Sequence, residues 1–541
     1  MTYFFLTKNA CKRTSLLLFP LTLLFCQSVV AQSAAEVNPT ANPTATATPN
    51  TNANISAENF ALPSLLNPVA YVQLLSTKNA DILISQLNSK VDRQMYNSES
   101  GIYEPIGYTT VRKEGRFRLN TVEEQIVSSN LPYLREQALI TETGIREKLP
   151  TGADATLGYQ VGSRTNNLIA SQTSGLFHTE FTSSLVFTLK QPLLRGFGRD
   201  VTETTKKLAE LDFLISKEQF KQQLFKSSLD GLNLYWQLYK NQQSLQLHDG
   251  AFKQAQDLMK NASARLKAGK ISESSLLEIR SMILLRSIEY QRSKQAFFDA
   301  KLKLLSSLGS KNNSTIDLQL IPDDHMPAGS PWLAQDSYLA PADVLSTWPL
   351  YTIATLHKQQ AEIKLRNLRN MNKPDLDFVM SGSGNGFAYK QGDAEREARG
   401  RKYPDWYIGF NLEVPLGGNY KASGLYAAQI ERLTQAEIEL ESLSVSSSND
   451  LLSAIEDSKI SYLSVQQSEQ DMQLQQTIYD NELRRFMLGN TILTTVIQKS
   501  NALMDAKMRH IDNLVKFEQS KTLFYIYSGQ FFDHYGIYLG S

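Results

Sequence analysis

The sequence predicts an α+β membrane protein in which amphipathic strands are joined to very long α-helices. Three observations predict this class: strict alternation of apolar and polar residues in four segments, helical stretches longer than those of globular domains, and repetition of this pattern along the 541 residues. Charge is balanced, with 55 Lys and Arg against 54 Asp and Glu, so no basic excess indicates a nucleic-acid partner.

Residues 1–31 have the composition of a signal peptide. Basic residues precede an apolar run at 15–25, which is too short to span a bilayer, and small residues end at Ala31. We therefore expect the mature chain to begin at Gln32, with a flexible low-complexity leader at 32–66 that is rich in Ala, Thr, Asn and Pro. No later apolar stretch reaches the roughly 18 residues that a membrane helix needs.

A lipoprotein signal at Cys26 is the alternative interpretation of this segment. Phe25 stands where lipidation needs a small residue, which disfavours that alternative. Cys11 and Cys26 are the only cysteines, so we expect a mature chain without disulfides or thiolate metal sites.

Residues 67–330 form the first of two predicted structural repeats. After a helix at 69–97 and a stretch at 106–150 without a clear pattern, a turn at 149–152 is expected to close a hairpin. Strands follow at about 153–164 and 181–191, each with one apolar and one polar face. Their length suits a lipid-facing barrel, although a soluble sandwich shows the same alternation.

Two helices complete the first repeat, at about 200–268 and 272–307. The first would be about 100 Å long at about 1.5 Å per residue. Its apolar residues follow the 3-4 spacing of a coiled coil, with a second apolar stripe beside the first. Two stripes predict a helix with neighbours on both sides, as in a ring of helices.

Residues 331–541 form the second predicted repeat, after a polar linker at 310–340. A helix is expected at 342–370, strands at about 375–381 and 405–415, and helices at about 420–488 and 491–527. The Gly-rich, charged segment 382–402 between the strands is predicted to be a water-exposed loop.

The two repeats share residues at matched spacing. Arg265 and Gly269 recur as Arg485 and Gly489, each shifted by 220 positions, and Leu189–Leu193 recurs in part as Leu412–Leu416, shifted by 223. The chain is therefore predicted to be a duplicated unit of helix, strand, strand, very long helix and return helix.

These motifs resemble the TolC family of outer-membrane efflux and secretion channels. The resemblance covers about residues 67–530 and is carried by Leu-Lys-Gln-Pro-Leu-Leu-Arg-Gly-Phe-Gly at 189–198, Pro-Leu-Gly-Gly at 415–418, Arg-Leu-Lys-Ala-Gly at 265–269 and Arg-Phe-Met-Leu-Gly at 485–489. It implies a homotrimer in the outer membrane of a Gram-negative bacterium, in which each subunit gives four strands to one twelve-stranded β-barrel. A periplasmic α-helical barrel continues the β-barrel inward.

The resemblance also implies a function. Family members are passive ducts of tripartite efflux pumps or type I secretion systems. They dock a periplasmic adaptor protein that is bound to an inner-membrane transporter, and they need no cofactor and catalyse no reaction. Two other classes stay open: a periplasmic coiled-coil scaffold without a pore, and a secreted hydrolase, for which we find no catalytic constellation.

The resemblance assigns two groups of candidate residues. The strand-to-helix turns contain Pro192, Gly196, Gly198, Pro415 and Gly417. The periplasmic tip and gate contain Arg265, Gly269, Glu273, Ser275, Glu278, Arg280, Arg485, Gly489, Thr495 and Gln498.

The tip departs from the family in its acidic residues. Positions that often carry aspartate are here Ser275, Glu278, Thr495 and Gln498, so an acidic constriction would depend on Glu278, with Glu273 nearby. The arginines before the tip glycines are expected to form closing ion pairs. The alternative is that all these charges are ordinary solvated side chains.

Other site types find little support. Gly196-x-Gly198 lacks the third glycine and the βαβ context of a dinucleotide fold, and the six histidines are scattered. Asp375 and Asp377 lack a loop of further calcium ligands, so we expect them to face a lumen. Trp406 and Tyr403 are expected to belong to an aromatic girdle at the membrane interface.

Overall fold

The computed structural model describes residues 65–127, 131–167, 169, 178–267, 269, 271–309, 319–320, 345, 347–400 and 402–537. All of them belong to one compact unit, Leu62–Ser541. The predicted signal peptide, almost all of the leader, and most of the linker at 310–340 lie outside the described residues.

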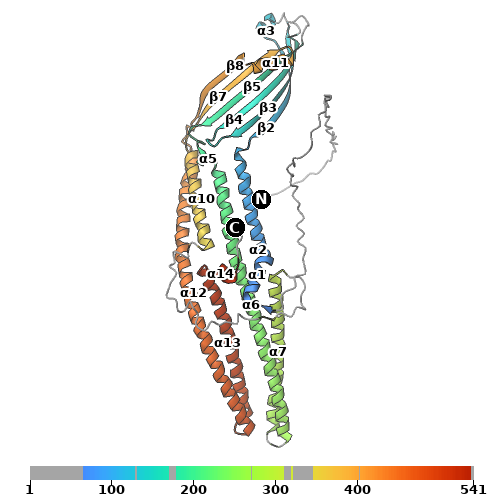
Figure 1. Ribbon diagram of the computed structural model, residues 1–541, viewed down its shortest axis with the longest axis vertical. Helices are drawn as coiled ribbons and strands as arrows, with labels where there is room; N and C mark the ends of the chain where they lie inside the picture. Colours follow the sequence, from blue (N-terminus) through green and yellow to red (C-terminus); the bar gives the residue numbers. More distant parts are fainter. Residues whose placement is uncertain are drawn as a thin grey trace, which may run out of the picture. The chain divides into compact units, whose positions relative to one another are not determined.

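One antiparallel sheet of six strands lies at one end of this unit (Figure 1). Its order is β2-β3-β4-β5-β7-β8, so strands that follow one another in the chain are neighbours in the sheet. The strands are β2 (Ile106–Leu119), β3 (Tyr133–Lys148), β4 (Asp154–Asn166), β5 (Thr179–Pro192), β7 (Asp375–Ala388) and β8 (Tyr403–Glu413).

The number of strands departs from the one that the resemblance implies. The four expected strands are β4, β5, β7 and β8, but β2 and β3 precede them as an additional hairpin formed by the stretch 106–148. Charged residues occupy many positions of this hairpin, which obscures its alternation in the sequence. The expected turn at 149–152 is present, and Gly152 donates its N–H to the carbonyl of Leu149 over 2.8 Å.

The segment 382–402 is not simply an exposed loop. Its first seven residues extend β7, and residues Gln391–Arg399 form the helix α11, which packs on the sheet. Gly386 makes this packing possible, because a Cβ there would lie 1.9 Å from the carbonyl oxygen of Ala394. Gly386 therefore marks the point at which α11 lies directly on β7.

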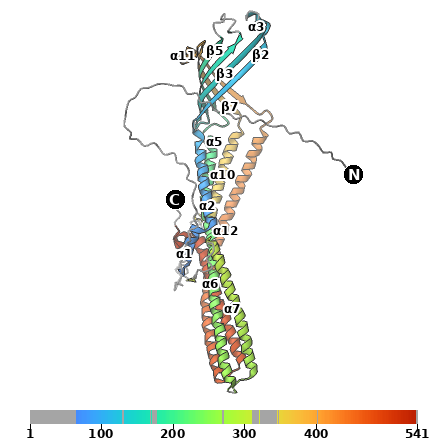
Figure 2. The ribbon, with the colours of Figure 1, turned by 90° about the vertical axis from the view of Figure 1, so that its right-hand side faces the viewer.

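Four of the described helices are much longer than the helices of most globular domains. Besides α11, the described helices are α1 (Pro68–Lys78), α2 (Ala80–Glu99), η1 (Ser100–Tyr103), α3 (Val122–Val127), α5 (Arg199–Thr202), α6 (Thr204–Lys267), α7 (Glu273–Ser307), α10 (Pro349–Met371), α12 (Tyr420–Leu488), α13 (Leu493–Tyr527) and α14 (Phe531–Tyr535). The four long ones, α6, α7, α12 and α13, have 64, 35, 69 and 35 residues. The pairs α6–α7 and α12–α13 are two helical hairpins, whose turns lie at the end away from the sheet (Figures 1 and 2).

Two helix boundaries differ from the prediction. The helix expected at 69–97 is broken at Asn79, which has an extended backbone and caps α2 by accepting hydrogen bonds from the N–H groups of Asp81 and Ile82. Within the helix expected at 342–370, α10 begins at Pro349 after an extended Trp348, because the residue before a proline favours an extended backbone. Residues 342–344 and 346 lie outside the described part of the chain.

The largest core lies where α1, α6 and α14 meet. Tyr71, Trp236 and Phe531 are fully buried there, and the Tyr71 hydroxyl is 2.8 Å from that of Ser307. A small parallel pair, β1 (Leu65–Leu66) with β6 (Gln319–Leu320), adjoins this core. The Tyr235 hydroxyl of α6 donates to the carbonyl of Leu66 over 2.8 Å and so holds the chain before α1 against this long helix.

Among the described residues, none of the helices combines the length and the low polarity that a bilayer-crossing helix needs.

Candidate functional site: the sheet faces and the hairpin tips

The sheet has two faces of opposite character. One face presents large apolar side chains in successive strands, and Trp406 and Phe410 on β8 are 74% and 70% exposed. The same face carries Leu157, Leu185, Phe187, Phe378, Met380, Ile408 and Leu412. Such exposure of contiguous apolar area is rare on soluble monomers and indicates contact with lipid or protein.

The opposite face is polar and contains ion pairs. Lys190 lies 2.8 Å from Asp377, and Arg195, just after β5, lies 3.1 Å from Asp375. Both aspartates are thus on the polar face, as the sequence predicted for a lumen. Tyr403 is also on this face, so it does not share a girdle with Trp406 on the other face.

The first strand-to-helix turn is a compact joint. Gly196 and Gly198 have φ values of 83° and 98°, which favour glycine, and they follow Pro192 at the end of β5. Asn370 of α10 holds this turn: its side chain accepts from the N–H of Gly196 over 2.8 Å and donates to the carbonyl of Leu194. The joint therefore fixes the direction in which α6 leaves the sheet.

The second strand-to-helix turn follows β8 and is less enclosed. Gly418 donates its N–H to the carbonyl of Pro415 over 3.3 Å and has a φ of 83°. Gly417, which the sequence singled out, has no positive φ and no atom near its absent side chain. The conformational requirement for glycine is therefore at Gly418.

The predicted tip glycines lie at the turns of the two helical hairpins. Gly269 and Gly489 have φ values of 66° and 84°, and Gly489 ends α12 in a left-handed conformation. An apolar cluster behind the turns joins the hairpins and contains Ala262, Ile279, Phe486, Leu493 and Val496.

Arg265 links the two hairpins instead of forming an ion pair. Its guanidinium donates to the carbonyl of Phe486 over 3.0 Å and to that of Met487, and it lies 5.5 Å from the centre of the Phe486 ring. A cation at the carboxyl end of α12 also interacts favourably with the helix dipole. Within one chain the acceptors of Arg265 are backbone carbonyls, and a closing ion pair in an assembled gate stays a prediction.

Arg485 does not occupy the equivalent role. It pairs with Glu482 one turn earlier in the same helix, at 3.0 Å. Although Arg265 and Arg485 match in sequence, only Arg265 connects one hairpin to the other.

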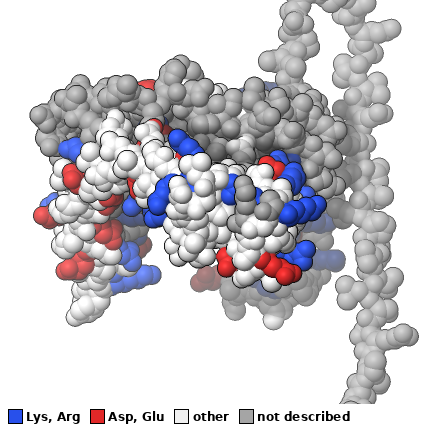
Figure 3. Space-filling model, turned by 90° about the horizontal axis from the view of Figure 1, so that it is seen from below, with Lys and Arg blue, Asp and Glu red and all other residues white. Residues whose placement is uncertain are grey.

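The remaining tip residues surround this link. Glu278 is exposed and accepts a hydrogen bond from the Thr494 hydroxyl over 3.4 Å. Ser275 lies in the first turn of α7 and donates its N–H to the capping hydroxyl of Ser272 over 3.3 Å. Glu273, Arg280 and Gln498 are exposed, and Thr495 is half-buried. Seen from the tip end, basic and acidic side chains of the described residues lie beside each other (Figure 3).

Three residues important for this geometry escaped the sequence analysis. Phe486 belongs to the motif at 485–489 but was given no role. Thr494 is next to the candidate Thr495, and no sequence pattern marks Asn370 as functional. The described residues also contain no cluster of acids, histidines or cysteines that could hold a metal ion.

Solved structures similar to this chain include proteins and channels of the outer membrane. A CusC structure, described in terms of transmembrane channel formation, matches with a TM-score of 0.61, 11% identity, and coverage of 85% of this chain and 91% of that chain. The VceC outer-membrane protein of Vibrio cholerae matches with a TM-score of 0.60 and 11% identity over 86% of this chain and 96% of that chain. The chain has the TolC-like channel fold.

A third solved structure gives the same result. The CmeC outer-membrane channel of Campylobacter jejuni has a TM-score of 0.59 and 12% identity, over 86% of each chain. The sequence itself matches no protein-family model and no curated protein. At this identity the likeness establishes the fold, and the resemblance first carried by the sequence motifs holds at the level of structure.

Proposed function

We propose that this protein is a passive export duct of the outer membrane. Copies of the sheet close into a β-barrel within the bilayer, and the long helices continue the passage into the periplasm. The duct serves an inner-membrane transporter through a periplasmic adaptor, in a tripartite efflux pump or a type I secretion system. It has no catalytic role.

The observation that carries this proposal is a two-faced sheet joined directly to long helices. A sheet with an exposed apolar face and an ion-paired polar face suits a wall between lipid and water. The long helices join the sheet at one end: β5 and β8 finish there, and β2 and β7 start there. Water on the polar face would therefore continue between the helices.

Exposed stripes on the helices support assembly with further copies of the chain. On α7, apolar residues at heptad-like spacing are exposed, and a comparable row follows α12. The first row is Leu277, Leu284, Ile288, Phe298 and Leu302, and the second is Ile438, Val445, Leu452, Leu463 and Leu474. Three copies, the number that the resemblance implies, would cover both rows in a closed ring.

The hairpin tips are the proposed place for the adaptor and the gate. Leu488 and Ile492 expose 77% and 68% of their surface at the turn between α12 and α13, which suits docking of another protein. In a threefold ring, Glu278 would place three carboxylates around the passage. The link through Arg265 would hold the two hairpins of each subunit together in the closed state.

The chain organisation completes the proposal. We propose that residues 1–31 are removed as a signal peptide, that 32–66 is a leader, and that the parts at 67–330 and 331–541 arose by duplication. Equivalent glycines, Gly309 and Gly529, follow α7 and α13 and have φ values of 65° and 76°, which agrees with two related units.

Cell fractionation distinguishes the duct from the alternative, a periplasmic coiled-coil scaffold without a pore. We expect the protein to sediment with the outer membrane and to resist extraction by alkaline carbonate, because a barrel wall is embedded in lipid. Release into the soluble periplasmic fraction would contradict the duct and favour the scaffold.

A further inference from the structure

We infer that the hairpin β2–β3 belongs to the barrel wall, and that β2 of one copy pairs with β8 of the next copy. Three copies of this six-stranded sheet would then give eighteen strands, in place of the twelve that the resemblance implies. Because barrel diameter grows roughly linearly with strand number, the barrel would be roughly 1.5 times as wide. The inference rests on the proposed membrane location.

The first observation is that β3 occupies the edge of β4. The two strands pair continuously from Glu136 opposite Asn166 to Lys148 opposite Asp154. A twelve-stranded barrel needs this same edge of β4 for the neighbouring copy. Since a strand edge can satisfy only one partner, the two arrangements exclude each other.

A side-chain contact on the polar face also holds the β2–β3 hairpin against β4. The Tyr108 ring of β2 lies over Gly144 of β3 and reaches Gly158 of β4: a Cβ at these glycines would lie 2.9 Å from the ring and 3.0 Å from the hydroxyl. The same hydroxyl donates to Glu142 over 2.7 Å. An aromatic ring over strand glycines is a recognised way to pin a register.

An ion-pair network crosses four strands near the opposite end of the hairpin. Glu136 of β3 lies 4.0 Å from Arg116 of β2 and 3.6 Å from Arg164 of β4, and Arg164 lies 3.4 Å from Glu180 of β5. Removal of the hairpin from the sheet would leave Arg164 without Glu136. The network thus holds β2 and β3 in line with the other strands.

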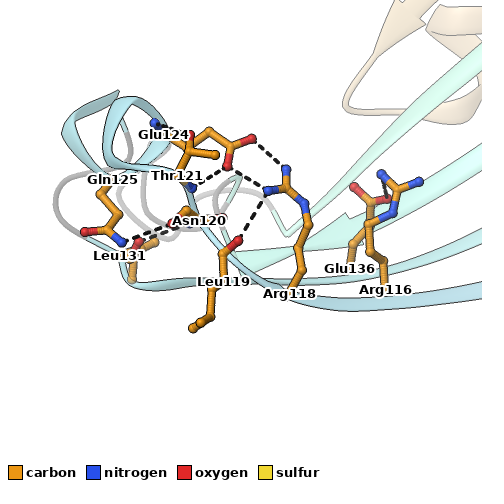
Figure 4. Close-up of polar contacts among 9 residues, drawn as sticks. All are labelled: Arg116, Arg118, Leu119, Asn120, Thr121, Glu124, Gln125, Leu131 and Glu136. Carbon is orange, nitrogen blue, oxygen red and sulfur yellow. Dashed lines mark hydrogen bonds and ion pairs between the residues drawn. The ribbon is translucent and has the colours of Figure 1, made fainter.

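Contacts among the described residues also hold both ends of the hairpin unit. Between β2 and β3, Arg118 binds both carboxylate oxygens of Glu124, and Thr121 and Glu124 cap α3 reciprocally (Figure 4). After β3, Thr151 accepts from the N–H of Gly198 over 3.0 Å, which ties the turn to the joint below β5.

The strand order leaves two edges that fit each other. Within the described residues, β2 and β8 each pair with a strand on one side only. Directions alternate across the sheet, so β2 and β8 run in opposite directions and would pair antiparallel between copies. Lipid cannot hydrogen-bond an open edge, so insertion requires these edges to be closed.

Cysteine pairs between copies test the seam. Asn411→Cys on the polar face of β8 is combined with Thr110→Cys or Arg112→Cys on β2, and in a second series with Thr156→Cys or Gln160→Cys on β4. Opposite residues in an antiparallel pair lie close enough for a disulfide. Oxidation in isolated outer membranes should give covalent oligomers in the β8–β2 series and none in the β8–β4 series.

The native cysteines, Cys11 and Cys26, lie outside the described residues, and the unmodified chain controls for them. Gln160→Cys with Ser184→Cys, which are opposite each other within one chain, is the positive control for oxidation. Covalent oligomers in the β8–β4 series, or in neither series, would overturn the inference. Because cross-linking needs no current, its result is distinguishable from a failure of the pore function itself.

Discussion

Gly231 and Gly250 both lie inside α6, but their surroundings differ. A Cβ at Gly231 would lie 2.3 Å from a methyl carbon of the fully buried Leu75 in α1, whereas nothing lies within 4 Å of Gly250. Glycine inside a helix costs about 1 kcal/mol relative to alanine. Close packing of α1 explains why a glycine stands at Gly231.

Alanine substitutions should separate these two effects. We expect Gly231→Ala to lower the free energy of unfolding by about 1–3 kcal/mol, because crowding in a tight core outweighs the gain in helix propensity. Gly250→Ala should instead raise it by up to about 1 kcal/mol. Unfolding followed by circular dichroism measures both, and a stabilised Gly231→Ala would contradict the packing of α1 on α6.

Glu124 gives the distal turn of the β2–β3 hairpin a pH dependence. The two hydrogen bonds from Arg118, followed by that from the Thr121 backbone, lower the pKa of Glu124 from its ordinary 4.5 to about 2. A lowered pKa stabilises the folded turn above pH 4.5, and this contribution is lost as the pH falls toward about 2.

A spin label in place of the exposed Val122 should report this loss as increased mobility between about pH 4.5 and pH 2. Glu124→Gln should make the label mobile already at neutral pH, whereas Glu123→Gln in the same helical turn should leave the titration unchanged. A titration that survives in Glu124→Gln would assign the transition to another group.

At the scale of elements, α11 depends on one glycine. Ala394 and Ala398 of α11 are buried, and α11 lies so close to β7 that no side chain fits at position 386. We expect Gly386→Ala to displace α11 and to speed trypsin cleavage after Arg396 and Arg399 in the purified protein. Gly382→Ala, at an open position on the same face of β7, is the control, and equal cleavage of both variants would contradict the packing.

The two hairpins should respond differently to loss of their matched arginines. Arg265→Gln removes charged hydrogen bonds to the end of α12, and we expect it to weaken the link between the tips by about 1 kcal/mol. Arg485→Gln removes only a pair within α12. In bilayers, Arg265→Gln should therefore increase the conductance and Arg485→Gln should not; the reverse order would make Arg485 the link.

The elements were predictable from sequence where the chain has a strong period. The helices α7, α12 and α13 lie within two residues of their expected bounds, because proline is absent from them and a tip glycine ends α12. The strands β4, β5 and β8 alternate clearly. The hairpin β2–β3 was missed because Lys113 and Arg135 interrupt its apolar face, and α11 was missed because a charged helix packs through two alanines.

The candidate site was only partly predictable. Motif positions located both tip turns and the joint after β5, since glycines with positive φ leave a mark in the sequence. Contacts between distant elements leave no such mark in the sequence. Asn370 binds Gly196 across 174 positions, and Arg265 binds backbone carbonyls, which every residue has. The matched positions of Arg265 and Arg485 in the sequence therefore suggested equal roles, but the two side chains make different contacts.

For the whole molecule, planar-bilayer recording of the purified protein tests the proposed duct most directly. We expect stable unitary current steps from the native protein and larger steps from Arg265→Gln, with a protein-free detergent preparation as the control. Larger steps from Arg265→Gln than from the native protein would support a pore that is narrowed at the tips. A complete absence of steps in both would contradict the central claim and leave a scaffold without a channel.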